Sequence, residues 1–177
     1  MSKVLIVVDM QNDFVYGSLG TKEARAIIPS IESKVRQYSE SEDGRIAFTS
    51  DTHDHDYLSS MEGKHLPVEH CIFGSNGWRI IDELFGYATN ADHYCNKQTF
   101  GYDDWEYEFR NDRSIESFEI VGVCTDICVI SNALILKSIY PEIPIIVDAS
   151  CCAGSTPENH CMALRIMKSC HIDIINE

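Results

Sequence analysis

The chain has 177 residues, of which 44% are hydrophobic and 24% are charged, and these proportions exclude a disordered or fibrous protein. Fourteen basic against 28 acidic residues leave a formal charge of −14, so we expect neither nucleic acid nor an anionic membrane as the main partner. No apolar run approaches the ~20 residues of a transmembrane helix and the N-terminal residues lack the pattern of a cleavable signal, so we expect one cytoplasmic globular domain over residues 1–177.

Short β-branched segments alternate with helical patterns along the chain. Val4–Val8 is a continuous apolar run, typical of a strand buried on both faces, and residues 22–40 carry apolar residues at helical spacing. Further strands are expected at Arg45–Ser50, His93–Asn96, Phe118–Val123, Ile143–Val147 and Ile172–Ile175, with helices over Asp126–Ile139 and from about Ser155. This alternation predicts an α/β fold with a central parallel six-stranded sheet between helices, and a site at the carboxyl ends of the strands.

Eight cysteines are present, and in a reducing compartment we expect most of their thiols to be free and buried. Cys128 falls in the first turn of the helix expected after the fourth strand, where the helix dipole favours a thiolate. Free backbone N–H groups in such a turn can bind an oxyanion. The alternative is that Cys124 and Cys128 only pack this junction. Their C-x-x-x-C spacing matches neither a zinc motif nor a thioredoxin motif.

Two charged residues end other predicted strands. Asp9 follows the first strand, where a carboxylate can be a base, a metal ligand or a cap for the next turn. A phosphotransferase of the haloacid-dehalogenase type would need a second aspartate two residues later, where this chain has Gln11. Lys97 ends the third strand and is either solvated or placed to lower the pKa of a nearby thiol. If strands one, three and four are neighbours, Asp9, Lys97 and Cys128 meet.

The segment at about 51–77 shows little periodicity, and long segments of this kind in compact domains are usually functional. Asp51 and His53 leave an extended strand on the same face, so both side chains can reach one ion. The nitrogen and oxygen ligand set that we expect is Asp51, His53, Glu62 and His70. Such a set suits zinc, manganese or ferrous iron. His55 and His65 compete for a place in it, and surface histidines without a metal are the alternative.

In this order, the motifs resemble the nicotinamidases of the isochorismatase-like cysteine hydrolase family. The resemblance covers nearly the whole chain and rests on Asp-x-Gln-x-Asp-Phe at 9–14, Asp-x-His at 51–53, Leu-Pro-x-x-His-Cys at 66–71, Lys97 and Thr-Asp-x-Cys-Val at 125–129. It implies a three-layer α/β/α fold and a catalytic triad of Asp9, Lys97 and Cys128. It also implies that the backbone N–H groups of Cys124 and Cys128 bind the oxyanion, and that the Val123–Cys124 peptide bond is cis.

The same resemblance assigns the metal and the substrate pocket. It implies one divalent ion, with zinc expected and manganese or iron as alternatives, bound by Asp51, His53 and His70. Members differ in the remaining ligand, and Glu62 matches the version with glutamate. The substrate residues that we expect are Phe14, Leu66 and Phe100. Many members carry an aromatic residue where this chain has Leu66, which leaves the shape of the pocket open.

The function that the resemblance implies is hydrolysis of nicotinamide to nicotinate and ammonia, through a thioester on the cysteine, in NAD salvage. Direct attack by a water activated at the metal is an alternative route. The alternative enzyme is a metal-independent relative that cleaves another small amide or carbamoyl compound, or an isochorismatase-type hydrolase. A catalytically inactive member of the fold that binds a metal or a partner protein is the third possibility. The aromatic stretch at 102–109 suits core, lid or subunit contact, so homo-oligomerisation stays open.

Overall fold

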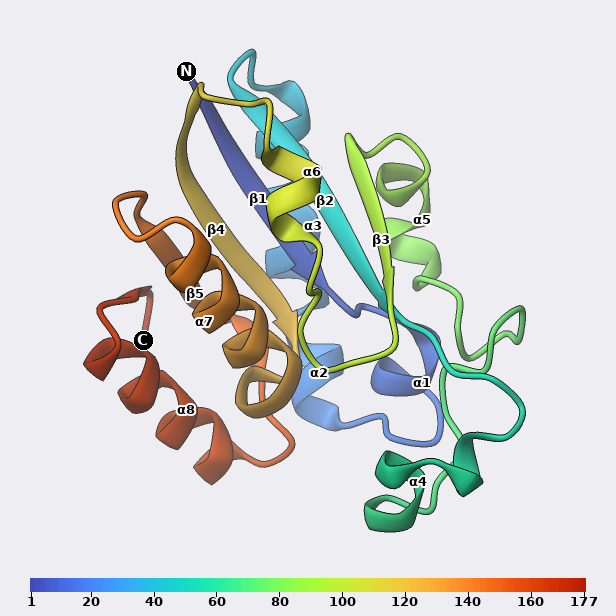
Figure 1. Cartoon of the computed structure of the whole chain (residues 1–177). Helices are drawn as coiled ribbons and strands as arrows, with labels where there is room; N and C mark the ends of the chain where they lie inside the picture. The colour runs from blue at the N-terminus through green and yellow to red at the C-terminus, as the bar shows by residue number, and fades with distance from the viewer.

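The computed structural model describes all 177 residues and contains one parallel six-stranded sheet, in the order β3-β2-β1-β4-β5-β6 (Figure 1). The strands are β1 (Ser2–Val8), β2 (Gly44–Asp51), β3 (His93–Lys97), β4 (Ile115–Val123), β5 (Ile145–Ala153) and β6 (Asp173–Ile175). The predicted α/β fold with a central parallel six-stranded sheet is therefore confirmed.

Helices cover both faces of the sheet, with α6, α7 and α8 on one face and α2, α3 and α5 on the other (Figure 1). The helices are α1 (Asn12–Val15), α2 (Lys22–Ala26), α3 (Ile28–Glu40), α4 (Met61–His65), α5 (Asp82–Ala88), α6 (Trp105–Phe109), α7 (Ile130–Ile139) and α8 (Pro157–Ser169). A 3-10 turn, η1 (Tyr57–Ser59), precedes α4, and a π-helical turn, η2 (Thr125–Val129), precedes α7. None of these helices has the length and apolar character that crossing a membrane requires.

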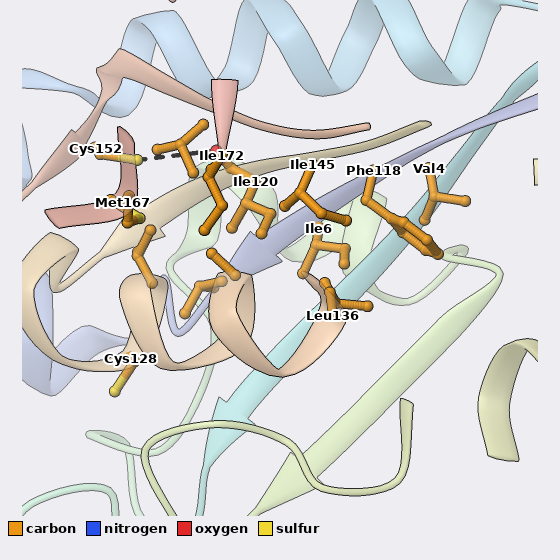
Figure 2. Packing of buried hydrophobic residues seen from close by; sticks show 14 of the residues in the cluster. Val4, Ile6, Phe118, Ile120, Cys128, Leu136, Ile145, Cys152, Met167 and Ile172 are labelled. Atoms are coloured by element: carbon orange, nitrogen blue, oxygen red, sulfur yellow. Dashed lines mark hydrogen bonds between the residues drawn. The ribbon is translucent and has the colours of Figure 1, made fainter. Parts of the chain in front are cut away.

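Strand β1 is continuously apolar from Val4 to Val8 because this part supplies side chains to two cores. Val4, Ile6 and Val8 pack under the face covered by α6, α7 and α8, whereas Leu5 and Val7 pack under the opposite face. All five are fully buried. Figure 2 shows the first of these cores, in which aliphatic side chains of the sheet meet those of α7 and α8, with Cys128 at its edge. The core therefore ends where the candidate site begins.

Several predicted boundaries were wrong. The helix expected over residues 22–40 is two helices separated at Ile27, because Pro29 lies in the first turn of α3, where a proline is tolerated but cannot continue a preceding helix. Strand β5 starts two residues later than expected and runs on to Ala153, since pairing of Cys152 with Gly122 of β4 continues the ladder. The helix expected from Asp126 begins as the π-helical turn η2.

The aromatic stretch at 102–109 belongs mainly to the core. Trp105 and Phe109 are buried, and their rings stack with centroids 5.6 Å apart and an interplanar angle of 8°. Nε1 of Trp105 donates a hydrogen bond to Oδ1 of Asn132 in α7, at 2.9 Å. Tyr107 is exposed. Of the three interpretations, core packing holds for Trp105 and Phe109.

Candidate active site and metal centre

The candidate site lies at the carboxyl ends of the central strands, as predicted. Asp9 follows β1, Asp51 ends β2, Lys97 ends β3, and Cys128 lies in η2 directly after β4. Gly122 allows β1 and β4 to approach closely at this end, because its φ is +117° and an added Cβ would lie 2.2 Å from the carbonyl oxygen of Val8. The peptide bond between Val123 and Cys124 is cis, as expected.

Asp9, Lys97 and Cys128 form one buried group. Nζ of Lys97 lies 2.7 Å from Oδ2 of Asp9 and donates to Sγ of Cys128 at 3.7 Å. Asp9 is completely buried, and its Oδ1 accepts a hydrogen bond from Oγ1 of Thr49 at 2.6 Å. The φ of Asp9 is 49°, which is uncommon for a residue other than glycine. This backbone conformation belongs to the turn that leaves β1.

Asp9, Lys97 and Cys128 come together although, contrary to expectation, their three strands are not all neighbours. Strands β1 and β4 are neighbours, but β2 separates β3 from β1. Neighbouring strands lie about 4.8 Å apart, so Lys97 has to span two strand spacings. The four-carbon side chain of lysine covers that distance along the end of β2, where Lys97 pairs with Asp51. The triad therefore depends on the length of this side chain rather than on adjacent strands.

Burial controls the protonation of this group. Burial raises the pKa of Asp9 above its usual value, while the charge of Lys97 opposes that rise. Burial also raises the pKa of the Cys128 thiol well above its usual value, against the opposing effect of Lys97. The expectation that a helix dipole would favour a thiolate was therefore wrong, because desolvation outweighs it. Burial therefore disfavours ionisation of the Cys128 thiol.

The lysine itself stays charged. Burial lowers the pKa of Lys97, but the negative charges of Asp9 and Asp51 and the hydrogen bond to Asp9 outweigh it and raise the pKa above the usual lysine value. Since an opposite charge within a few ångström favours the ionised form, Lys97 is a permanent cation between two carboxylates. It stabilises negative charge at whichever of its partners carries it.

The four predicted metal ligands also come together. One ligand atom from each of Asp51, His53, Glu62 and His70 lies within 4.8 Å of all the others. Oδ2 of Asp51 is 3.0 Å from Nε2 of His53 and 3.5 Å from Nε2 of His70, and Oε1 of Glu62 is 3.7 and 3.8 Å from the same two nitrogens. His55, by contrast, is exposed and outside the group.

The donors in this group suit a divalent ion. Nε2 of His53 is buried and has no hydrogen-bond partner, which is a costly state for a polar atom unless a ligand satisfies it. Nδ1 of His70 lies 2.8 Å from the carbonyl oxygen of Val68, so this nitrogen donates and the lone pair of Nε2 faces the group. His65 instead bonds to the carbonyl oxygen of Met61 through Nδ1. Two histidines and two carboxylates match the ligand chemistry of zinc.

Gln11 holds Asp51 in place, a role that the sequence reasoning did not assign. Its Oε1 accepts a hydrogen bond from the backbone N–H of Asp51 at 2.8 Å, and its Nε2 donates to the carbonyl oxygens of Asp51 and Trp78, both at 2.8 Å. Asp13 acts similarly, because its Oδ2 accepts from the backbone N–H of Cys71 at 2.8 Å. Both residues belong to the motif at 9–14, whose spacing was the available signal.

A cavity of about 260 Å³ joins the two groups. Asp51, Glu62, His70 and Cys128 all line it, together with Cys124. Its other walls are the three predicted substrate residues Phe14, Leu66 and Phe100, and also Leu19, Thr21, Ile127 and Ser155, which the sequence reasoning missed. These four are ordinary apolar or hydroxyl side chains, and nothing in their spacing marks them.

The turn that carries Cys128 is fastened to the start of α8. Asp126 accepts hydrogen bonds from Ser155 through both carboxylate oxygens, from the backbone N–H at 2.7 Å and from Oγ at 2.6 Å. Oγ1 of Thr125 lies 2.8 Å from Nδ1 of His160. Burial lowers the pKa of His160 below its usual value, with Asp126 opposing the shift. The first two residues of η2, Thr125 and Asp126, therefore tie the turn that carries Cys128 to the start of α8.

The family can now be identified. The sequence of residues 3–176 matches the protein-family model of the isochorismatase domain. The chain belongs to the isochorismatase family. Its relatives cover this isochorismatase-family chain almost from end to end, so the likeness includes the sheet, η2 and the irregular segment.

Three relatives illustrate the likeness. The nicotinamidase/pyrazinamidase of Mycobacterium tuberculosis is 26% identical over 192 residues, covering 98% of each chain. The crystal structure of nicotinamidase from Bacillus subtilis is 27% identical with a TM-score of 0.85, covering 99% of this chain and 100% of that one. The pyrazinamidase of Pyrococcus horikoshii in complex with zinc is 25% identical with a TM-score of 0.80, covering 100% of both. With such relatives, this isochorismatase-family chain is an amidohydrolase.

Proposed function

We propose that this enzyme hydrolyses nicotinamide to nicotinate and ammonia, through a thioester on Cys128, and so supplies nicotinate to NAD salvage. The observation that carries the proposal is the cavity that has the Cys128 thiol and three of the four metal-ligand candidates in its wall. Nicotinamide has a carboxamide that can react with the Cys128 thiol and a ring nitrogen that can bind a metal ion. The relatives named nicotinamidase support the same substrate.

Substrate binding follows from the lining of the cavity. Phe14, Leu66 and Phe100 provide apolar walls for a flat aromatic ring. Asp51, His53, Glu62 and His70 would hold the ion, which we propose to be zinc. When bound, the ion supplies a Lewis acid for the ring nitrogen and thereby fixes the orientation of the carboxamide. Orienting the amide in this way lowers the entropic part of the barrier.

The first half of the reaction forms the thioester. Asp9 accepts the proton of the Cys128 thiol, and the sulfur attacks the carbonyl carbon of the carboxamide. The backbone N–H groups of Cys124 and Cys128 donate to the oxyanion of the tetrahedral intermediate. Asp9 then gives its proton to the leaving nitrogen, and ammonia departs as the carbon–nitrogen bond breaks. Its raised pKa suits Asp9 to both proton transfers.

The second half returns the enzyme to its starting state. A water molecule gives a proton to Asp9 and attacks the carbonyl carbon of the thioester. The same two backbone N–H groups donate to the carbonyl oxygen. When the second tetrahedral intermediate collapses, the carbon–sulfur bond breaks, the sulfur recovers the proton from Asp9, and nicotinic acid leaves and loses its own proton to solvent or ammonia to become nicotinate. Lys97 remains an ammonium ion throughout and holds the carboxylate of Asp9, at 2.7 Å, in position for both proton transfers.

Ammonia release from nicotinamide tests this proposal. The zinc-loaded wild type should turn nicotinamide over, whereas Cys128→Ala should not, and Cys161→Ala, which changes an exposed cysteine, should behave as the wild type. No turnover by the wild type would refute the proposed substrate. Cleavage of another amide or a carbamoyl compound that is insensitive to a chelator would favour the metal-independent alternative, and turnover by Cys128→Ala would exclude the thioester.

A further inference from the structure

A second, larger hollow lies directly against the active-site cavity. This entrance groove has a volume of about 700 Å³ and shares the residues Glu62, Leu66, Phe100 and Ile127 with the cavity. The groove's remaining walls come from α4 and from the loop after β3, among them Met61 and Thr99. Because the two spaces share these four residues, they lie directly beside one another.

Four apolar residues and four polar ones line the entrance groove: Met61, Leu66, Phe100 and Ile127, and Glu62, His65, Gln98 and Thr99. Three of the apolar side chains are exposed. Met61 is 67% exposed, Phe100 47% and Leu66 36%. Single exposed apolar side chains are ordinary on a protein surface, but a contiguous group beside a binding cavity marks a contact site. Leu66 and Phe100 line both spaces, so they lie at the boundary between them.

The two volumes suit different parts of one ligand. Pockets for drug-sized ligands measure roughly 300–1,000 Å³; the cavity, at about 260 Å³, falls below that range, and the groove, at about 700 Å³, falls within it. The cavity therefore fits a compact ring with a carboxamide. Anything larger on that ring has to lie in the groove, between Leu66 and Phe100.

We propose that the entrance groove is a substrate subsite for an apolar substituent on the pyridine ring, so that the enzyme's substrates include alkyl-substituted pyridine carboxamides. This inference rests on the proposed function and extends it to a substrate class. The carboxamide remains at Cys128, and the substituent passes between Leu66 and Phe100 onto Met61. The chemistry of the amide cleavage is unchanged.

The expected gain appears in binding rather than in the chemical step. Each buried methylene strengthens binding on the order of fourfold, and a propyl group that is partly buried in an open groove should gain on the order of tenfold. Because the groove lies away from the reacting carbonyl, this contact is equally strong in the ground state and the transition state. Uniform binding of this kind lowers KM and leaves kcat unchanged.

The test compares nicotinamide with 5- and 6-propylnicotinamide as substrates of the zinc-loaded enzyme. We expect one of the two propyl compounds to show a KM on the order of tenfold below that of nicotinamide, with a similar kcat. Met61→Lys should reduce the ratio of kcat/KM for that compound to kcat/KM for nicotinamide by about threefold or more. The matched control is Met162→Lys, which changes another exposed methionine, on α8, and should leave the ratio unchanged.

The subsite is refuted if neither propyl compound exceeds nicotinamide in kcat/KM, or if Met61→Lys and Met162→Lys give the same ratio. A wild type that hydrolyses neither nicotinamide nor either propyl compound contradicts the proposed function instead. In that case calorimetry still decides on the groove, because it measures the affinity of Cys128→Ala for propylnicotinamide and for nicotinamide without turnover. Equal dissociation constants would overturn the subsite, and tighter binding of a propyl compound that Met61→Lys abolishes would support it.

Discussion

Nζ of Lys97 lies 2.7 Å from Oδ2 of Asp9, at a point where both side chains are buried. The same nitrogen is 3.7 Å from Sγ of Cys128 and 3.5 Å from Oδ1 of Asp51. One cation thus connects the proposed base and nucleophile to the proposed metal ligand Asp51. The electrostatics of the two groups are therefore coupled, and a change at Lys97 affects the pKa values of its neighbours.

Replacing Lys97 should shift the pH profile of the enzyme. Asp9 acts as a base only when ionised, so activity falls as the pH drops below its pKa. Lys97 lowers the pKa of Asp9 against burial, which raises it, so Lys97→Met should move the acidic limb of kcat/KM about 1–3 pH units upward. Lys22→Met, whose side chain is 86% exposed, should leave the limb in place. An acidic limb that does not move in Lys97→Met would show that Asp9 is not the base.

Metal content should depend on His53 and not on His55. His53 contributes a buried Nε2 without a hydrogen-bond partner, whereas His55, two residues away, is exposed and outside the ligand group. After loading with zinc and gel filtration, elemental analysis should find about one zinc per chain in the wild type and in His55→Ala, and almost none in His53→Ala. Equal zinc contents in the two variants would place the metal elsewhere.

The sequence identified the residues with distinctive chemistry and missed those that act through packing. Asp9 and Cys128 stand at strand ends, where parallel strands bring side chains to one edge of the sheet, so their proximity was predictable. The strand order is a property of the whole sheet, and the path of Lys97 past β2 was therefore not predicted. Thr21 and Ser155 line the cavity as ordinary hydroxyl residues. The raised pKa of Cys128 comes from burial by the folded chain, which a local helix-dipole argument omits.

The Asp126 carboxylate should position the turn that carries Cys128. It accepts two hydrogen bonds from Ser155, and hydrogen bonds to a charged group contribute about 1.5–3 kcal/mol. Asp126→Ala should lower the free energy of unfolding by about that amount in urea titrations. It should also reduce kcat more than it raises KM. Asp103→Ala, which removes an exposed carboxylate, is the control. If Asp126→Ala lost stability but kept its full kcat, the positioning role would be refuted.

A buried charge cluster remote from the site should govern acid stability. Lys34 of α3 contacts the carboxylates of Glu119 and Asp148. Burial alone would raise the pKa of Asp148, but Lys34, Ser150 and Asn176 hold it below the usual value. Its contribution to stability is therefore complete above its unfolded-state pKa of about 4 and is lost as the pH falls through the lower, folded-state value.

Asp148→Asn tests this cluster. Removing one partner of a buried ion pair should lower the free energy of unfolding at pH 7 by roughly 3 kcal/mol, and the difference from the wild type should shrink as the pH falls below about 4. The control is Asp43→Asn, at a side chain that is 70% exposed, where the change should stay within about 0.5 kcal/mol. A difference between Asp148→Asn and wild type that is independent of pH would contradict the electrostatic explanation.

The most direct test of the account is whether nicotinamide forms a thioester on Cys128. Zinc-loaded enzyme is mixed with nicotinamide, quenched in acid within milliseconds and analysed by mass spectrometry of the intact chain and of its peptides. The account predicts a mass increase of one nicotinoyl group, located on the peptide with Cys128 and absent from Cys128→Ala. Full ammonia release with no such adduct at any quench time, together with unchanged turnover by Cys128→Ala, would contradict it.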